Sequence, residues 1–373
     1  MKLQILQENL SSALNIASRF SSNKVQLPVL GNILFSAKKS KLVISSTNLE
    51  ISVSINVGAK VLEEGDLSMP ARVITELVGN LPHETIDIET TKEQLKVATS
   101  GFASTVLGMN SGDFPKIPGN ITTAKALNIQ QKDFVEALSH VIFATSIDET
   151  RPVLTGVLII LNKGELSLVA TDGFRLSQKK IKIASSEGTF KIVLPKTILS
   201  EITRVGGEEN LLFDIEEKEK QAIFGVGEII LSSRLLEGDF PDYEKIIPKS
   251  SSCKIFVDKE EISRAVKLAS IFARDNANIV KIKVLKDSLK ISAESGQSGN
   301  QETKVDARVE SGSSNLESGF EIAFNYKYLE DFLHSVSGEE IQIEFSGPVT
   351  AGVFRDSRDT SCLHLIMPVR VQG

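Results

Sequence analysis

The sequence predicts an α+β fold of three similar modules, each combining antiparallel sheets with two helices. A strand-then-helix pattern recurs three times along the 373 residues. Between the helices, apolar and polar residues alternate over short stretches, as they do in half-buried strands. Because short turns join these strands, we expect antiparallel sheets with helices on one face. The length also suits two or three domains.

The first repeated element is a short strand that leads directly into an amphipathic helix. It occurs in residues 3–20, 127–144 and 255–273. Apolar side chains recur three and four positions apart, which places them on one helix face. Asp133 and Asp258 stand in or just before the first turn of two of these helices, where a carboxylate favours the N-terminal end.

Paired strands and a second strand-to-helix junction follow in each copy. The strand pairs read VLGNILFS with KLVISSTN, VLTGVLIIL with ELSLVATD, and IVKIKVL with SLKISAES. The second helices are expected to open at residues 69–72, 194–197 and 324–327, and the first two of these segments carry proline. Proline suits a first helical turn because its missing N–H would be unpaired there.

The ends of the first two modules repeat a further motif, SGDFP at residues 111–115 and EGDFP at 237–241. Their separation nearly equals that of the helices that open the two modules, so two independent features show the same period. Residues 118–120 and 248–252 are typical of linkers. We therefore expect modules at residues 1–121, 122–250 and 251–373.

Composition argues against several classes of function. The net charge of −6 argues against tight, charge-driven binding of nucleic acid. The sequence has no apolar run long enough to span a membrane, and its N-terminus is too polar for a signal peptide, so a cytoplasmic protein is expected. No phosphate-binding loop, nucleophile elbow or H-E-x-x-H motif occurs, so neither catalysis nor a cofactor is expected.

Cysteines and histidines predict no metal site. Cys253 and Cys362 lack a C-x-x-C partner and are expected to be packed thiols. The four histidines, at positions 83, 140, 334 and 364, are scattered along the chain. Their spacing does not assemble a ligand set.

Five motifs in order resemble the bacterial DNA polymerase III β subunit family of sliding clamps. They are LPVLGN at residues 27–32, DETRPVL at 148–154, ATDGFRL at 170–176, GDFPDY at 238–243 and MPVR at 367–370. Each alone is weak, but their order on a threefold repeat of this length extends the resemblance over the whole chain. It implies a head-to-tail homodimer that closes as a ring around duplex DNA, with helices lining the hole and sheets outside.

The resemblance also implies partners and a docking pocket. The partners would be duplex DNA bound without sequence preference, an ATP-driven clamp loader, and DNA polymerase III and other replication or repair proteins that dock through short peptides. An apolar slot with a few polar groups suits such peptides. The pocket would lie between the second and third modules and include Arg151, Leu154, Thr171, Gly173, Phe174, Arg175, Leu176, Pro241, Lys245, Ile246, Asn325, Tyr328, Val349, Leu365, Ile366, Met367, Pro368, Val369 and Arg370.

Plainer roles stay open for several pocket residues. Asp172-Gly173 could be only a turn between strands, and Leu154 and Leu176 could be ordinary core. Met367-Pro368 could be a terminal edge strand that proline blunts.

Three residues and one segment depart from the family pattern. Phe174, Lys245 and Ala277 stand where other residue types are expected, which leaves the preferred partner motif open. Residues 295–300 are interpreted as a lengthened loop.

The resemblance assigns DNA contacts to Lys24, Arg72, Lys196 and Arg204. Acidic residues are almost as frequent in the same helices, so a mixed solvated face is an equal interpretation for any one of them. An enclosing ring can nevertheless slide on weak phosphate contacts. An alternative function is a protein-interaction scaffold of the same fold that does not encircle DNA.

Ring closure would join the first module to the third module of the partner. Val106, Ile271 and Phe272 are interface candidates, because the family uses apolar contacts there. Ile271 and Phe272 could equally belong to the core of their own module.

Overall fold

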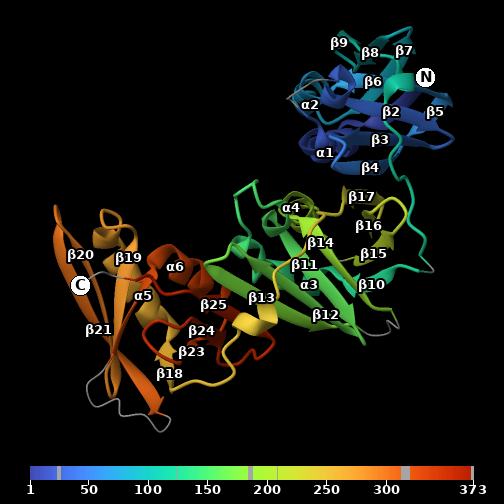
Figure 1. Cartoon of the computed structure of the whole chain (residues 1–373). Coiled ribbons are helices and arrows are strands. Elements are labelled where there is room, and N and C mark those ends of the chain that lie inside the picture. Colours follow the sequence, from blue (N-terminus) through green and yellow to red (C-terminus); the bar gives the residue numbers. More distant parts are fainter. Residues whose placement is uncertain (23–26, 124, 184–187, 208, 312–319, 371–373) are drawn as a thin grey trace. The chain divides into compact units, whose positions relative to one another are not determined.

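The computed structural model describes residues 1–22, 27–123, 125–183, 188–207, 209–311 and 320–370. The chain divides into two compact units (Figure 1). Unit 1 comprises residues 1–132 and 197–235, and unit 2 comprises residues 133–196 and 236–373. None of the helices in the described residues is long and apolar enough to cross a membrane.

Unit 1 contains a five-stranded sheet, in the order β5-β1-β7-β8-β9, and an eight-stranded sheet, in the order β10-β15-β16-β17-β4-β3-β2-β6. The second sheet continues from the first module into the second through the pairing of β17 with β4. The strands of unit 1 are β1 (Lys2–Leu6), β2 (Asn32–Lys38), β3 (Lys41–Thr47), β4 (Ile51–Gly58), β5 (Lys60–Glu63), β6 (Gly65–Pro70), β7 (Thr85–Thr91), β8 (Gln94–Ala98), β9 (Ala103–Leu107), β10 (Leu127–Gln130), β15 (Asn210–Glu216), β16 (Gln221–Val226) and β17 (Ile229–Arg234).

Unit 2 contains a twelve-stranded sheet, in the order β14-β11-β12-β13-β25-β24-β23-β18-β21-β20-β19-β22. Here β13 pairs with β25, which joins the second module to the third. The strands of unit 2 are β11 (Gly156–Asn162), β12 (Glu165–Thr171), β13 (Arg175–Lys182), β14 (Phe190–Pro195), β18 (Cys253–Asp258), β19 (Ile279–Val284), β20 (Ser288–Ser295), β21 (Gly299–Ser311), β22 (Phe320–Asn325), β23 (Glu340–Phe345), β24 (Gly352–Asp356) and β25 (Cys362–Ile366). The strand pairings described in both units are antiparallel, as predicted.

Helices begin where the repeated junctions predict them. They are α1 (Gln7–Ala17), α2 (Ala71–Gly79), α3 (Gln131–Ser139), α4 (Lys196–Arg204), α5 (Lys259–Ala273) and α6 (Tyr326–Ser335). Pro70 precedes the first residue of α2, and Pro195 precedes that of α4. The Asp258 side chain accepts a hydrogen bond from the backbone N–H of Glu261 and so caps α5.

The segment predicted as a lengthened loop, residues 295–300, is instead the tip of a long hairpin, so that prediction was wrong. Strands β20 and β21 pair as far as Ser295 and Gly299, and both appear in orange in Figure 1. The Ser295 hydroxyl accepts backbone hydrogen bonds from Gln297 and Ser298, and Gly299 has φ +97°, which favours glycine. Turn residues such as serine, glycine and asparagine therefore closed a tight turn here.

The predicted packing of the cysteines is confirmed. Cys253 and Cys362 are both free and buried. Cys253 belongs to the main core of the third module, with Phe324, Phe345 and Phe354. A buried thiol packs as a small apolar side chain.

Candidate functional site

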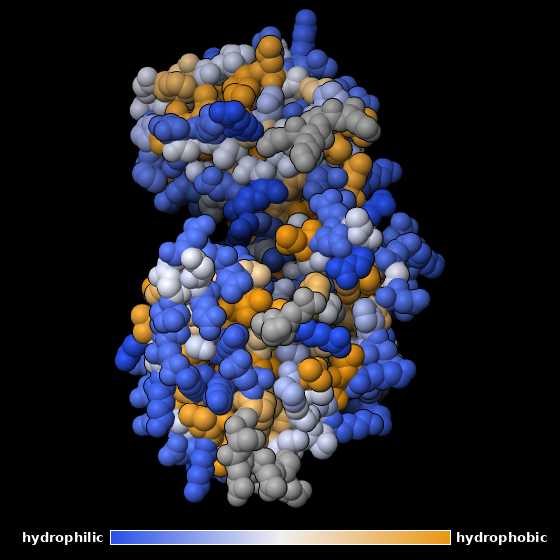
Figure 2. Space-filling view, turned by 60° about the vertical axis from the view of Figure 1, so that its left-hand side comes forward, coloured by the Kyte–Doolittle hydropathy of each residue, from blue (hydrophilic) through white to orange (hydrophobic). Residues whose placement is uncertain are grey.

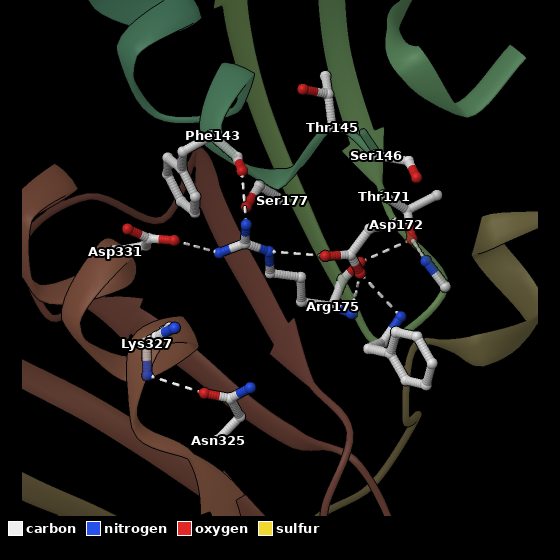
Figure 3. Close-up of polar contacts among 12 residues, drawn as sticks. Phe143, Thr145, Ser146, Thr171, Asp172, Arg175, Ser177, Asn325, Lys327 and Asp331 are labelled. Carbon is white, nitrogen blue, oxygen red and sulfur yellow. Dashed lines mark hydrogen bonds and ion pairs between the residues drawn. The ribbon is translucent and has the colours of Figure 1, made fainter. Parts of the chain in front are cut away.

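The turn between β12 and β13 is built by short side chains that satisfy its backbone. The Asp172 carboxylate accepts N–H bonds from Phe174 at 2.8 Å and Arg175 at 3.0 Å. The Thr171 hydroxyl donates to the Arg175 carbonyl at 2.6 Å and accepts from the Gly173 N–H at 3.1 Å. Gly173 has φ +95°. Asp172-Gly173 is therefore a strand-joining turn, and it also positions Arg175 (Figure 3).

The Arg175 guanidinium connects the second module to the third. Its Nε lies 3.0 Å from Asp172 Oδ2, and its terminal nitrogens contact Asp331 on α6 and the Phe143 carbonyl, the latter at 2.6 Å (Figure 3). Its carbon lies 4.5 Å from the Tyr328 ring centroid, a cation–π distance. The side chain is only 12% exposed, and each of its three guanidinium nitrogens has a partner. Arg175 therefore has a structural role in joining the two modules.

Apolar side chains form the base of the predicted pocket. Leu154, Leu176 and Leu365 are buried in one cluster with Phe240 and Tyr243. This cluster joins β13 and β25 across the two modules. Leu154 and Leu176 are thus core residues, as their plainer interpretation allowed.

Four other residues predicted for the pocket have exposed apolar side chains. Phe174 is 60% exposed, and Ile246, Val349 and Met367 are exposed as well. On the face shown in Figure 2, polar residues predominate and apolar residues occur in small groups. Such exposed groups are candidate contacts for a partner.

The C-terminal segment is held by backbone bonds. The Met367 N–H donates to the Phe174 carbonyl at 2.8 Å, and the Val369 N–H donates to the Ala323 carbonyl at 2.8 Å. Ile366 is buried, whereas Arg370 is exposed. Met367 and Pro368 therefore follow β25 rather than forming an edge strand of their own.

Polar groups of the predicted site are engaged locally. Arg151 lies 2.9 Å from Asp148. Hydrogen bonds from Thr150 and then Arg151 lower the pKa of Asp148. Lys245 pairs with Asp242 at 2.7 Å, and that hydrogen bond raises the pKa of Lys245.

Two further predicted residues lie at the start of α6. The Asn325 side chain accepts from the Lys327 N–H at 3.0 Å (Figure 3) and so caps α6. Burial raises the pKa of Tyr328, whose ring faces Arg175. Pro241 is exposed. Phe143 and Asp331 were not among the predicted site residues, because nothing in their spacing indicates a contact with Arg175.

Predicted DNA contacts differ in their environments. Arg72 is exposed and pairs with Glu76 at 2.9 Å. Arg204 pairs at 2.5 Å with Glu201, which also holds Arg19 at 2.6 Å. Lys196 is half-buried at the start of α4, and Lys24 lies outside the described residues. Acidic partners thus offset two of the predicted cations.

The residues predicted for the dimer interface also differ in their exposure to solvent. Val106 is buried in the sheet of its own module, Phe272 packs against the core of the third module, and Ile271 is exposed. Strand β9 ends the five-stranded sheet, and its last residue, Leu107, is exposed.

Comparison with solved structures identifies the class. A DNA polymerase sliding clamp from Bacillus subtilis matches with a TM-score of 0.94 and 27% identity, covering 100% of both chains. A DNA polymerase III beta chain from Streptococcus pneumoniae matches with a TM-score of 0.92 and 25% identity, covering 99% of this chain and 100% of the other. The fold is that of a sliding clamp, a processivity factor without catalysis of its own.

The family follows from the sequence matches. The N-terminal, central and C-terminal domains of the DNA polymerase III beta subunit match residues 1–118, 128–242 and 244–370. The Beta sliding clamp of Staphylococcus aureus is 28% identical over 381 residues, which covers 99% of each chain. The chain belongs to the DNA polymerase III beta subunit family.

Proposed function

We propose that this chain closes around duplex DNA as a head-to-tail homodimer and tethers DNA polymerase III and other replication or repair proteins to it. The match of all three family domains, in order, carries this proposal. A clamp loader opens the ring, and the protein works in the cytoplasm. The enclosing ring is favoured over a non-encircling scaffold because the likeness to sliding clamps extends over the full chain.

Partner peptides dock, in this proposal, on the surface of unit 2 above the cluster of Leu154, Leu176 and Leu365. Three features support it: a buried apolar floor, exposed apolar groups at Phe174 and Met367, and a C-terminal segment held by backbone bonds. Apolar pockets bordered by a few polar groups suit short peptides. The remaining residues predicted for the pocket complete its border.

Ring closure is proposed to use the free edge of β9. An edge strand offers unpaired backbone groups to another chain, and exposed apolar side chains strengthen such a contact. The proposed interface residues are Val106, Leu107, Ile271 and Phe272, of which Leu107 and Ile271 have exposed side chains. We propose module borders near residues 121 and 250, so that β9 belongs to the first module and Ile271 and Phe272 to the third.

Enclosure rather than attraction holds the DNA in this proposal. The chain carries a net charge of −6, and two of the proposed DNA-facing cations are paired with carboxylates. Weak phosphate contacts permit sliding, since no base is recognised.

The experiment that tests this function follows the clamp on circular DNA. Loaded by its clamp loader onto a nicked circle, the dimer should stay bound through gel filtration and leave once the circle is cut to a linear molecule. Retention on linear DNA, or failure to load, would contradict encirclement. A variant that lacks residues 367–373, part of the proposed docking surface, should load and slide normally. This result would separate DNA enclosure from partner binding.

Replacing Glu201 by glutamine should strengthen the salt-dependent part of DNA binding. Glu201 is 8% exposed and neutralises Arg19 and Arg204, so the variant leaves two cations without their carboxylate. We expect the slope of log affinity against log salt for linear DNA to steepen by about 1. Fluorescence anisotropy with labelled duplex at several salt concentrations measures this slope.

Glu339→Gln is the matched control, since it removes the partner of exposed Arg358, which is outside the proposed DNA-facing set. It adds the same charge and should leave the slope unchanged. Equal slopes for both variants would remove Arg204 from the DNA contacts.

A further inference from the structure

Three potential metal ligands that are far apart in the sequence meet inside unit 2. His140 directly follows α3, and Cys362 and His364 lie on β25. One ligand atom from each lies within 4.8 Å of the other two. The side chains are 5%, 1% and 2% exposed. The scattered positions of the histidines and cysteines in the sequence predicted no metal site, whereas the fold brings these three side chains together.

The distances suit a late transition metal. Sγ of Cys362 lies 3.2 Å from Nε2 of His364. A tetrahedral zinc ion, with bonds of about 2.3 Å to sulfur and 2.0 Å to nitrogen, holds such a pair about 3.5 Å apart. Around the same ion two imidazole nitrogens lie about 3.3 Å apart. The ligand atoms lie within 4.8 Å of one another, so His140 needs to approach by at most about 1.5 Å to complete three ligands.

Neighbouring groups orient His364 as a ligand. Its Nδ1 lies 2.8 Å from the Ser177 hydroxyl on the paired strand β13. When Nδ1–H donates to this hydroxyl, the lone pair of Nε2 faces Cys362. A hydrogen bond at the second ring nitrogen is the usual way in which proteins orient a metal-binding histidine. The rings of Phe143 and Phe332 pack on the imidazole at 5.6 and 4.9 Å and confine it.

His140 supplies a second, independent indication. Its Nδ1 is buried and has no hydrogen-bond partner in the part of the chain that the structure describes. A buried polar atom without a partner costs about 1–3 kcal/mol. A bound cation would satisfy a group that the protein itself leaves unpaired.

Charge near the three side chains is compatible with a cation. Lys179, opposite Cys362 in the strand register, is ion-paired with Asp359. The buried Asp356 carboxylate accepts backbone hydrogen bonds from Gly338 and Arg358. Two more cations, Arg175 and Arg355, act on the same ligands. They are paired with Asp172 and Glu344, so each of these three cations has a carboxylate partner and Asp356 adds one further negative charge.

We propose that His140, Cys362 and His364 form a buried site for one zinc-type ion, with two imidazole nitrogens and one thiolate as ligands and a water molecule in the fourth position. Burial keeps the thiol protonated in the metal-free protein. On binding, the Cys362 S–H bond breaks, the sulfur bonds to Zn²⁺ and the proton goes to the solvent.

The ion would fasten the second module to the third. His140 belongs to the second module, whereas β25 belongs to the third and ends just before Met367. A metal that joins both stabilises this junction, because ion binding adds to the free energy of the folded form. This proposal is independent of DNA encirclement and concerns the integrity of the surface next to the docking residues.

The test uses the full-length protein after treatment with a chelator. One equivalent of zinc chloride should remain with each chain through gel filtration, as measured by elemental analysis. Cobalt(II) should give the strong visible absorption of a tetrahedral site and a sulfur-to-cobalt band in the near ultraviolet. Cys362→Ser should lose the sulfur band and the stoichiometric zinc, and His140→Gln should lose stoichiometric zinc.

Cys253→Ser is the matched control, because Cys253 is equally buried but lies on β18 and is not one of the three grouped ligands. It should retain zinc and the cobalt spectrum. Ser177→Ala should weaken zinc binding by about 10–100-fold, as removal of a group that orients a ligand does. Circular dichroism identifies any variant that fails to fold. Absence of the sulfur band in the wild-type protein would overturn the proposal without any variant, and so would equal zinc retention by folded Cys362→Ser.

Discussion

Replacing Arg175 by alanine should lower the free energy of unfolding of unit 2 by about 3 kcal/mol. The change removes the guanidinium donor from Asp172 Oδ2 and from the Phe143 carbonyl in a largely buried place. Removal of one partner from a buried pair costs about 3–5 kcal/mol. The lower value is expected because Asp331, the third partner, is partly exposed. The aromatic contact with Tyr328 is lost as well.

Urea unfolding followed by tyrosine fluorescence measures this effect selectively. The chain has three tyrosines and no tryptophan, and Tyr243, Tyr326 and Tyr328 all belong to unit 2. Circular dichroism reports on both units. Different unfolding midpoints from the two probes would show that the units unfold separately.

Arg151→Ala is the matched control for this prediction. Arg151 also pairs with an aspartate three positions away, but its side chain is half exposed, so the loss should stay below about 1 kcal/mol. Arg175→Lys should fall between the two, since it keeps the charge and loses the planar fork. Equal urea midpoints for Arg175→Ala and Arg151→Ala would contradict the role of Arg175 in joining the two modules.

Deleting residues 367–373 should weaken the binding of polymerase-derived peptides by at least about 100-fold, or roughly 2.7 kcal/mol. The deletion removes exposed Met367 and the backbone bonds from Met367 to Phe174 and from Val369 to Ala323. The proposed pocket then loses one side. Anisotropy of a labelled peptide from the polymerase measures the affinity.

Two variants separate docking from general damage. Met367→Ala keeps the backbone bonds and should give a smaller loss, because only the adaptable apolar contact is removed. Leu62→Ala removes an exposed leucine of unit 1 and should leave the affinity unchanged. The truncated chain should keep the mass of the dimer. Unchanged peptide affinity would place the docking site elsewhere.

Local pattern accounts for most of the secondary structure that was predicted. Apolar spacing placed the helices, and alternation placed the strands, because both periods arise within a few residues. The same reasoning was wrong for residues 295–300, where turn residues closed a hairpin through Ser295 instead of forming a loop. The type of element was easier to predict than the length of a strand, since pairing with a partner strand sets where a strand ends.

The contacts that the sequence did not predict are tertiary contacts between residues far apart in the chain. Sequence alone allowed a turn at Asp172-Gly173 and predicted apolar residues for the proposed pocket, because turn chemistry and hydrophobicity are local properties. It did not indicate that Arg175 meets Phe143 and Asp331, or that His140 meets Cys362 and His364. The contact with Phe143 arises from the fold of the second module. The contacts with Asp331, Cys362 and His364 join two modules, which meet where β13 pairs with β25.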